Sequence, residues 1–504
     1  MDKPTFKEES LNYHIEGKPG KLEVRATTPL ETQADLSMAY SPGVAHACEY
    51  IVEDPLNASK VTARGNLVAV ISNGTAVLGL GAIGALASKP VMEGKAVLMK
   101  KFSDIDTFDL EIDETDPEKL VNIIAALEPT FGGIVLEDIK APDCFIIEQR
   151  LRELMDIPVF HDDQHGTAII AVAGLINALH LTGRDIKDTR IVCNGAGAAG
   201  IACIELAKAL GVPHDNVILC DAKGVIYKGR AEGMNQWKSA HAVETDARSL
   251  YDALKGADVF LGVSVKGALT EDMLKVMAPN PVIFAMANPD PEITPEEAHG
   301  IRDDAIVATG RSDYPNQVNN VLGFPYIFRG ALDVQATEIN DAMKIGCIEG
   351  IAALARATTS AEAAAAYKGE HLTFGPDYLI PKPFDPRLVG VVASAVAKAA
   401  MESGVATRPI TDMAAYKAAL DQSVFKSALL MRPVFDAART SRRRIVFAEG
   451  EDERVLRAAQ AMIEETGDAP ILIGRPGVVE DRCETHGLTI RAGQDFQLAT
   501  QRIY

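Results

Sequence analysis

A glycine-rich turn in the middle of the chain constrains the fold more than any other feature. Residues 190–194 read as a strand, and they run directly into the turn and a helix predicted to extend to about Leu210. A GxGxxG turn between a strand and a helix is typical of a Rossmann domain, where the helix N-terminus faces the pyrophosphate of a dinucleotide. Gly195 permits the tight turn, Gly197 lets the backbone approach a phosphate, and Gly200 lets the helix pack on the strand. The candidate cofactor-binding residues of the turn are Gly195, Ala196, Gly197, Ala198, Ala199 and Gly200.

The segment that begins at this turn alternates predicted strands with helices. The strands are Ile191–Asn194, Val217–Cys220, Asp258–Val263, Val282–Ala287 and Ala305–Ala308. This alternation predicts a parallel sheet with helices on both faces, so the fold class is α/β with a doubly wound dinucleotide domain. Asp221 follows the second strand, where an acid binds the ribose of NAD, whereas Lys223 would suit the 2′-phosphate of NADP. The sequence leaves that choice open, and a turn that binds no ligand is the alternative.

A second GxGxxG motif, Gly79–Gly84, lies in a different context. Asn73-Gly74 is a hairpin signal between two apolar runs, and Pro90 leaves little room for a helix after the motif. We therefore expect a hairpin here, followed by a strand at Ala96–Met99, and we assign the nucleotide to the other turn. The uncharged stretch Leu67–Ser88 is long enough for a membrane span, but its glycines favour a buried hairpin and turn.

Two acidic pairs precede the nucleotide turn, each at the end of a predicted strand. Glu137-Asp138 ends an apolar run, and Asp162-Asp163 follows the strand-like segment Ile157–Phe160. Carboxylates gathered at strand ends suit a hard divalent cation such as Mg²⁺ or Mn²⁺. Helix capping and turn formation are the alternative explanation of such pairs. The apolar segment Thr167–Leu181 then predicts a helix buried between two domains.

The composition limits the possible partners. A chain of 504 residues is long enough for about three or four domains. Its net charge of −20 argues against nucleic acid or an anionic membrane as a partner. The cysteines are scattered and form no CxxC, which is typical of reduced thiols, and the polar N-terminus has no signal-peptide pattern. We therefore expect a cytoplasmic location.

The last third of the chain predicts helices and then a new α/β unit. Ala331–Ala366 and Leu388–Glu402 read as helices that flank the proline-rich loop Phe374–Pro386. From Met431 the pattern restarts, and its elements are a basic run at 442–444, strand Ile445–Ala448, helix Arg454–Glu465 and strand Pro470–Ile473. The predicted domains are an N-terminal α/β domain with the acidic pairs at 1–165, a Rossmann-type NAD(P) domain at 166–345, a helical part at 346–428 and a partial α/β domain at 429–504.

A series of motifs occurs in order between about residues 15 and 425. They are Ala39–Ala45 (AYSPGVA), Asn73–Gly81 (NGTAVLGLG), Glu93–Lys95 (EGK), Glu137-Asp138, Asp162–Thr167 (DDQHGT), Ala287–Pro289 (ANP) and Asn319–Val321 (NNV). Together they resemble the malic enzymes, in particular the bacterial NADP-dependent type with a phosphate acetyltransferase-like domain fused behind it. The tail from about Met431 resembles the start of a phosphate acetyltransferase domain, here truncated.

This resemblance implies a function and a set of site residues. The expected reaction is the oxidative decarboxylation of malate to pyruvate and CO₂ with reduction of NADP, or of NAD, in the presence of Mg²⁺ or Mn²⁺. The implied roles are Tyr40 as general acid, Lys95 as general base, Glu137, Asp138 and Asp163 as metal ligands, Asp162 as the residue that orients Lys95 or a water, and Asn288 and Asn320 as contacts of nicotinamide or substrate. A homodimer or higher oligomer is expected, with acetyl-CoA as a candidate regulator through the C-terminal domain.

Several alternatives remain open at this point. Larger malic enzymes carry Gly-Glu-Arg where this chain has Gly74-Thr75-Ala76, so the group that binds the substrate carboxylate is not identified. Burial beside a dication would lower the pKa of Lys95 and make it a base, whereas alone it reads as a surface lysine, and Tyr40 alone reads as a packed aromatic. The alternative functions are an acyl-CoA-regulated or acyltransferase-type protein acting through the C-terminal domain, and an NAD-dependent 2-hydroxy acid dehydrogenase without decarboxylation.

Overall fold

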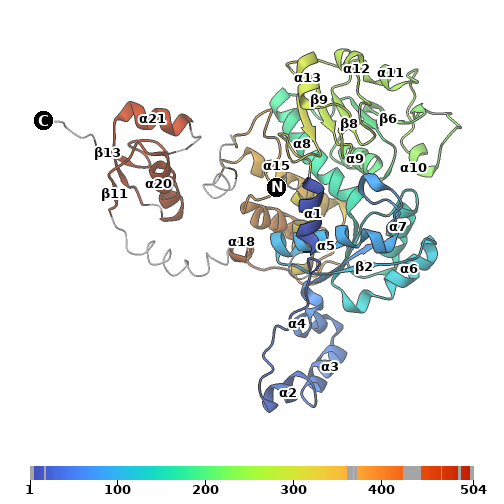
Figure 1. Cartoon of the computed structure of the whole chain (residues 1–504), viewed down its shortest axis with the longest axis vertical. Helices are drawn as coiled ribbons and strands as arrows, with labels where there is room; N and C mark the ends of the chain where they lie inside the picture. The colour runs from blue at the N-terminus through green and yellow to red at the C-terminus, as the bar shows by residue number, and fades with distance from the viewer. Residues whose placement is uncertain are drawn as a thin grey trace.

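The computed structural model describes residues 5–15, 19–359, 367, 372–423, 444–466, 468–485, 488 and 490–499 (Figure 1). An N-terminal arm leads into one α/β domain and then a second, and helices follow before a small C-terminal domain. The helices that precede the first sheet are α1 (Phe6–Ile15), α2 (Gln33–Ala39), α3 (Val44–Glu53) and α4 (Ala58–Val61), and the arm is formed by α2 and α3. Helices α2 and α3 project away from the two α/β domains, at the bottom of Figure 1, and bury none of their residues.

The first sheet is parallel throughout and has the strand order β2-β1-β3-β4. Its strands are β1 (Leu67–Ser72), β2 (Asp106–Glu111), β3 (Gly133–Leu136) and β4 (Val159–His161), and its helices are α5 (Ala85–Ser103), α6 (Pro117–Ala125) and α7 (Asp143–Leu154). Strand β1 lies between two neighbours and is buried over its whole length, which explains its unbroken apolar sequence. The neighbouring strands β3 and β4 end at the two acidic pairs, so both pairs lie at one edge of this sheet.

The predicted hairpin after β1 and the predicted strand Ala96–Met99 are both wrong. Strands β2 and β3 occupy the two edges of β1, so neither edge is free to pair with residues 76–80. The chain turns instead at Gly74, whose φ of +66° favours glycine, and the Gly74 carbonyl accepts a hydrogen bond from the N–H of Gly84 at 3.0 Å. Gly84 precedes α5, which continues through Pro90. A proline inside a helix removes one backbone hydrogen bond, and the buried face of α5 offsets that loss.

The second domain is the predicted Rossmann-type sheet with helices on both faces (Figure 1). Its strands, in the order β10-β9-β8-β5-β6-β7 with only β7 antiparallel, are β5 (Ile191–Asn194), β6 (Val217–Asp221), β7 (Gly224–Val225), β8 (Val259–Gly262), β9 (Val282–Ala285) and β10 (Ile306–Thr309). Its helices are α8 (Thr167–Thr182), α9 (Ala198–Ala209), α10 (Gln236–Ser239), α11 (Leu250–Leu254), α12 (Glu271–Lys275) and α13 (Pro295–Ile301). The chain leaves β5 for β6 on one side and returns to β8 on the other. The carboxyl end of β5 is therefore the switch point at which such sheets bind ligands.

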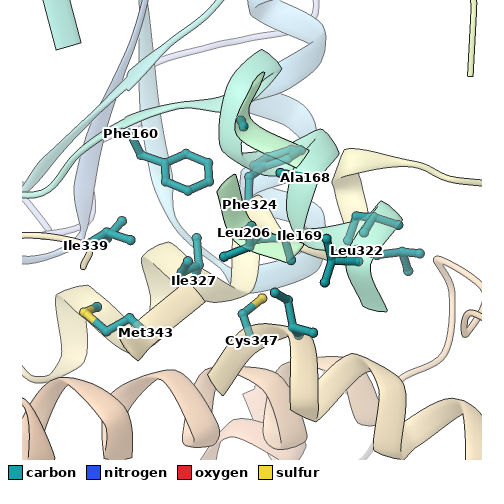
Figure 2. Close-up of a cluster of buried hydrophobic side chains, with 14 of the residues drawn as sticks. Phe160, Ala168, Ile169, Leu206, Leu322, Phe324, Ile327, Ile339, Met343 and Cys347 are labelled. Carbon is teal, nitrogen blue, oxygen red and sulfur yellow. The ribbon is translucent and has the colours of Figure 1, made fainter. Parts of the chain in front are cut away.

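Helix α8 joins the two domains and forms much of their common core. Figure 2 shows Ala168 and Ile169 of its first turn beside Phe160 of β4 and Phe324, the first residue of α14 (Phe324–Asp333). Among the described residues, the segment Asp162–Thr182 alone is long and apolar enough to span a membrane by length and composition. Within its most apolar window, 67% of the residues are buried inside the fold, so the apolar sequence is accounted for by packing. The predicted helix between the domains is confirmed.

The part of the chain that follows the second domain is helical. Besides α14, its helices are α15 (Asp341–Arg356), α17 (Ser394–Glu402) and α18 (Met413–Ser423), and a π-helical turn at Val389–Ala393 precedes α17. The predicted helical segment Ala331–Ala366 is confirmed in part, since it contains the end of α14 and the whole of α15, which are separate helices because Asn340 caps the start of α15. Residues 360–366 of that prediction lie outside the described residues, whereas the predicted loop Phe374–Pro386 is confirmed.

The small C-terminal domain has a three-stranded parallel sheet with the order β11-β12-β13. Its elements are β11 (Val446–Phe447), α20 (Glu453–Thr466), β12 (Ile471–Ile473), α21 (Pro476–Thr485) and β13 (Gln497–Ala499). The predicted strand–helix–strand unit is confirmed, and it encloses a core of its own around Leu456 and Leu472. The predicted start at Met431 and the first two residues of the basic run at 442–444 lie outside the described residues.

Candidate active site

The glycine-rich turn has the geometry predicted for a nucleotide-binding turn. Gly195 has φ +126°, and a Cβ there would lie 2.4 Å from the carbonyl oxygen of Val263. A Cβ on Gly200 would lie 1.8 Å from the carbonyl oxygen of Gly195, because the helix packs closely on the turn. Around Gly197, by contrast, no atom of the described residues beyond Gly197 and its two chain neighbours lies within 4 Å of the added Cβ. The turn is therefore packed on two sides and open on the side that would face a phosphate.

Asp221 ends β6 but is not a free acceptor for a ribose. Its carboxylate accepts two hydrogen bonds from Arg230, at 2.7 and 2.8 Å, and one from Lys238 at 2.8 Å. Burial raises the pKa of Asp221, but hydrogen bonds from Lys238 and Arg230 outweigh that effect and hold the pKa below its usual value. Lys223 pairs with Glu232. Neither Arg230 nor Lys238 was predicted, because Arg230 lies in a loop after β7 and Lys238 in the short helix α10, where no sequence motif marks them.

Three carboxylates meet where β3 and β4 end. Glu137, Asp138 and Asp163 each offer an oxygen, and these oxygens all lie within 4.8 Å of one another. Asp138 has φ +54°, and its N–H donates to Asp163 Oδ2 at 2.8 Å, which ties the two loops together. Glu137 Oε2 is buried without a hydrogen-bond partner among the described residues. Oxygen donors in this arrangement, one of them unsatisfied, fit a hard divalent cation such as Mg²⁺ or Mn²⁺.

Lys95 extends from α5 into this carboxylate cluster, and only 10% of its side chain is exposed. Its Nζ lies 2.5 Å from Asp162 Oδ2, 3.0 Å from Glu137 Oε1 and 4.2 Å from the centre of the Phe324 ring. The alternative that Lys95 is a solvent-exposed surface residue is therefore wrong. Burial lowers the pKa of Lys95, but the charges of Asp162 and Glu137 outweigh burial, and the pKa lies above the ordinary lysine value. The predicted lowering applies to Lys95 beside a bound dication and stays a prediction, because the surrounding carboxylates alone favour the ammonium form.

Asp162 connects the first domain to the second. Besides Lys95, its Oδ2 accepts a hydrogen bond from Asn320 Nδ2 at 3.0 Å, and Asn320 begins the turn before α14. Asn288 follows β9 and is exposed, and its carbonyl oxygen lies 3.5 Å from the position of a Cβ on Gly79. The glycine motif that the sequence suggested as a hairpin thus faces the loop of Asn288. Both predicted asparagines lie on the side of the second domain that faces the first.

Glu148 is a buried residue of this region that the sequence analysis missed. Its carboxylate accepts a hydrogen bond from the N–H of His161 at 3.0 Å and lies 2.8 Å from Nε2 of His165. Burial lowers the pKa of His165, so the neutral ring donates to Glu148 at neutral pH. Glu148 thereby fixes both ends of the turn that carries Asp162 and Asp163. Its position on the buried face of α7, among apolar residues, was the available signal, because a buried carboxylate requires partners.

Tyr40 does not join this cluster within one chain. It follows α2 on the projecting arm, and Figure 1 shows that α2 lies far from α5, the helix that carries Lys95. The side chain of Tyr40 is 72% exposed, so the alternative of a packed aromatic is also wrong. The predicted pairing of Tyr40 with Lys95 is therefore absent from the single chain.

Family models match three parts of the chain. The model for the malic enzyme N-terminal domain matches residues 19–120, and the model for the malic enzyme NAD binding domain matches residues 164–367. The model for phosphate acetyl/butaryl transferase matches residues 429–502. These matches follow the order of the domains along the chain.

Individual relatives agree with the family models. The NADP-dependent malic enzyme of Rhizobium meliloti is 62% identical over 497 residues, which cover 98% of this chain and 65% of the relative. The NAD-dependent malic enzyme of the same organism is 58% identical over 492 residues, which cover 97% of this chain and 64% of that relative. The chain thus spans about 65% of the length of the first of these curated relatives. A crystal structure of malic enzyme from Pyrococcus horikoshii is 39% identical, with a TM-score of 0.76, over 85% of this chain and 97% of that one. Because the chain covers nearly all of that structure at this identity, it belongs to the malic enzyme family.

Proposed function

We propose that the chain catalyses the oxidative decarboxylation of malate to pyruvate and CO₂, with reduction of NADP and with Mg²⁺ or Mn²⁺ bound. The observation that carries this proposal is the contact of Asp162 with both Lys95 and Asn320. It brings an acid–base group and a cluster of carboxylates to the edge of the dinucleotide domain. Oxidation at C2 followed by loss of CO₂ requires these groups within reach of one bound substrate.

Glu137, Asp138 and Asp163 are the residues that would hold the dication. A dication bound there supplies Lewis-acid stabilisation of the negative charge that develops as CO₂ leaves. With the carboxylate charges offset, the pKa of Lys95 falls toward the range in which an amine accepts a proton. Lys95 then takes the hydroxyl proton of malate as hydride leaves C2, and Asp162 keeps Nζ aimed at that proton.

Tyr40 acts as the general acid from a second copy of the chain. The exposed position of Tyr40 and the absence of buried residues in α2 and α3 support this assignment. Apolar side chains on the arm, among them Tyr50 and Val52, are also exposed, and a second copy would cover them. In a symmetric dimer each arm would reach the cluster of the other chain, so each site would combine Tyr40 of one copy with Lys95 of the other.

Mixing two inactive variants tests this arrangement. Tyr40→Phe and Lys95→Ala should each be inactive as homodimers, because every site lacks one of the two groups. Co-expression of both variants should restore about a quarter of the wild-type activity, since half of the dimers are mixed and each mixed dimer has one intact site. A mixture that forms mixed dimers and stays inactive would contradict the shared site.

NADP is the preferred cofactor, and the residues around Asp221 support this choice. Asp221 is already occupied by Arg230 and Lys238, so it cannot serve as the acceptor for a free 2′-hydroxyl. Two cations on one carboxylate leave a net positive charge beside the ribose position, which suits a 2′-phosphate. Lys238→Ala should therefore raise the KM for NADP by roughly tenfold and leave the KM for NAD nearly unchanged. Lys228→Ala, at an exposed lysine nearby, is the control, and an equal change for both cofactors would refute the assignment.

The direct test of the whole proposal is malate-dependent absorbance of the reduced cofactor in the near ultraviolet. NADP and NAD are compared, each with and without Mn²⁺, and CO₂ release is measured in parallel. Cofactor reduction without CO₂ would instead identify a 2-hydroxy acid dehydrogenase that does not decarboxylate. No reduction with either cofactor would refute the proposal.

A second candidate function concerns an acyl-CoA, and it rests on the match of residues 429–502 to the phosphate acetyl/butaryl transferase family. In this case acetyl-CoA acts as a regulator of malate turnover through the C-terminal segment. A titration of turnover with acetyl-CoA, with free CoA as the control, tests it. Turnover that does not respond to acetyl-CoA would remove this candidate.

A further inference from the structure

The glycine-rich turn follows the carboxyl end of β5, and the carboxyl ends of β8 and β9 lie on one side of it. The strand order places β6, which ends at Asp221, on the other side of β5. A dinucleotide seated on the turn therefore extends its adenosine half over β6 and its nicotinamide half over β8 and β9. This placement rests on the proposed function.

Glu292 joins these strand ends and is fully buried. Its Oε1 accepts hydrogen bonds from Ser264, from the N–H at 2.7 Å and from Oγ at 2.9 Å, just beyond β8. Its Oε2 accepts a hydrogen bond at 3.0 Å from the N–H of Ala287, just beyond β9. Asn194, the last residue of β5, donates from Nδ2 to Ser264 Oγ at 2.9 Å. One carboxylate thus fixes the ends of three strands relative to one another.

We propose that Glu292 is a positioning residue for hydride transfer. The residue after Ala287 is Asn288, so the hydrogen bond from Ala287 to Glu292 sets where the Asn288 loop begins. Ser264 is held by the same carboxylate and lies next to Val263, whose carbonyl packs on Gly195 of the turn. Glu292 therefore fixes the distance between the pyrophosphate turn and the Asn288 loop, and that distance sets where the nicotinamide ring lies. It acts through these residues and does not contact the cofactor itself.

Glutamine cannot replace Glu292 in this network. Each carboxylate oxygen accepts from a backbone N–H that cannot reorient, one from Ser264 and one from Ala287. Whichever way the glutamine amide is turned, its NH₂ group meets one of these two donors. One buried donor is then left unsatisfied, and one of the two loops moves away from its place. Glu292→Gln preserves size and shape, so its effect isolates the acceptor role of the second oxygen.

The experiment compares Glu292→Gln with Asp258→Asn in the full chain. Asp258 precedes β8 at the opposite end of the strand, where it accepts from the N–H of Arg190 at 2.9 Å and pairs with Arg184 at 3.1 Å. It is therefore a carboxylate-to-amide control on the same strand but away from the cofactor edge. Three quantities are measured: affinity for NADPH from its fluorescence, affinity for 2′,5′-ADP, and the deuterium isotope effect on kcat with malate deuterated at C2.

Glu292→Gln should weaken the affinity for NADPH by roughly tenfold or more and leave the affinity for 2′,5′-ADP unchanged. It should also raise the isotope effect on kcat, because hydride transfer becomes slower. Asp258→Asn should change none of the three. Unchanged NADPH affinity and isotope effect in Glu292→Gln would overturn the proposal, as would an equal loss of NADPH and 2′,5′-ADP affinity. If Glu292→Gln does not fold, Ser264→Ala provides the test. We expect it to weaken NADPH affinity and raise the isotope effect less strongly, and to leave the affinity for 2′,5′-ADP unchanged. Failure of the proposed function would appear separately, as absent malate-dependent reduction in the unmodified chain, whereas the two affinities need no turnover.

Discussion

The substitution Gly197→Ala separates cofactor binding from folding. Gly197 has φ −96° and ψ −164°, which alanine adopts without strain. Apart from Gly197 and its two chain neighbours, no described residue has an atom within 4 Å of the added Cβ. A glycine-to-alanine change at a compatible site stabilises a protein by about 0.4–1 kcal/mol, because the unfolded chain loses freedom. The melting temperature should therefore stay unchanged or rise slightly. The new methyl group, however, occupies the open side of the turn, where a phosphate would approach.

The expected cost to cofactor affinity follows from the hydrogen bonds that the phosphate loses. A hydrogen bond to a charged group contributes about 1.5–3 kcal/mol, so losing one raises the Kd for NADPH about tenfold to hundredfold. Titration of NADPH fluorescence measures this, and differential scanning fluorimetry of the free protein measures stability. Gly200→Ala is the contrasting variant, because its Cβ would lie 1.8 Å from the Gly195 carbonyl and should destabilise the fold itself. Wild-type NADPH affinity in a stable Gly197→Ala protein would refute the assignment of the turn.

Three further predictions concern the carboxylate cluster. Lys95→Ala should reduce kcat about 10²–10⁴-fold, measured by NADPH formation. Lys89→Ala, at a half-buried lysine of the same helix that pairs with Asp109, should not reduce kcat, and an equal loss in both variants would remove the special role of Lys95. Asp163→Asn keeps the shape of the site but removes one ligand charge, so the Mn²⁺ concentration needed for half-maximal activity should rise at least tenfold; an unchanged requirement would exclude Asp163 as a ligand. Burial raises the pKa of Glu137 well above its usual range, so the folded metal-free protein holds a proton that the unfolded chain releases above about pH 4.5. The stability of the metal-free protein should fall as pH rises toward the raised pKa of Glu137. Over the same pH range Mn²⁺ should bind more tightly, because it displaces the proton from Glu137. Calorimetric titration of Mn²⁺ at about pH 6 and about pH 8 checks this.

The strands of the second domain were predictable because each is a short apolar run followed by a glycine or polar break. Ile191–Asn194 and Val282–Ala285 show the pattern, since a central parallel strand is buried on both faces and local sequence alone reveals this. The region of α5 was mispredicted because Asn73-Gly74 and Pro90 are local signals, while the structure there is decided by partners distant in sequence. Both edges of β1 are taken by strands that follow later, and no local pattern shows that.

The candidate site was predictable to the extent that its residues stand in motifs. Glu137, Asp138 and Asp163 are brought together as predicted, because parallel strand ends share one edge of a sheet. The pKa of Lys95 could not be predicted, since it depends on how many carboxylates lie around the amine in three dimensions. The position of Tyr40 could not be predicted either, because a motif identifies a residue without showing whether it lies in the active site of its own chain or of a second copy.

The turn that carries Asp162 and Asp163 continues without interruption into α8. One of the three carboxylates of the cluster is therefore attached to the helix around which the two domains are packed, whereas Glu137 and Asp138 belong to the first sheet alone. Any pivoting of the domains about α8 changes the spacing of the ligands, so ion affinity and interdomain angle are thermodynamically linked. A ligand or mutation that favours the interdomain angle at which all three oxygens converge therefore raises the affinity for the ion. The bound ion favours that angle by the same free energy.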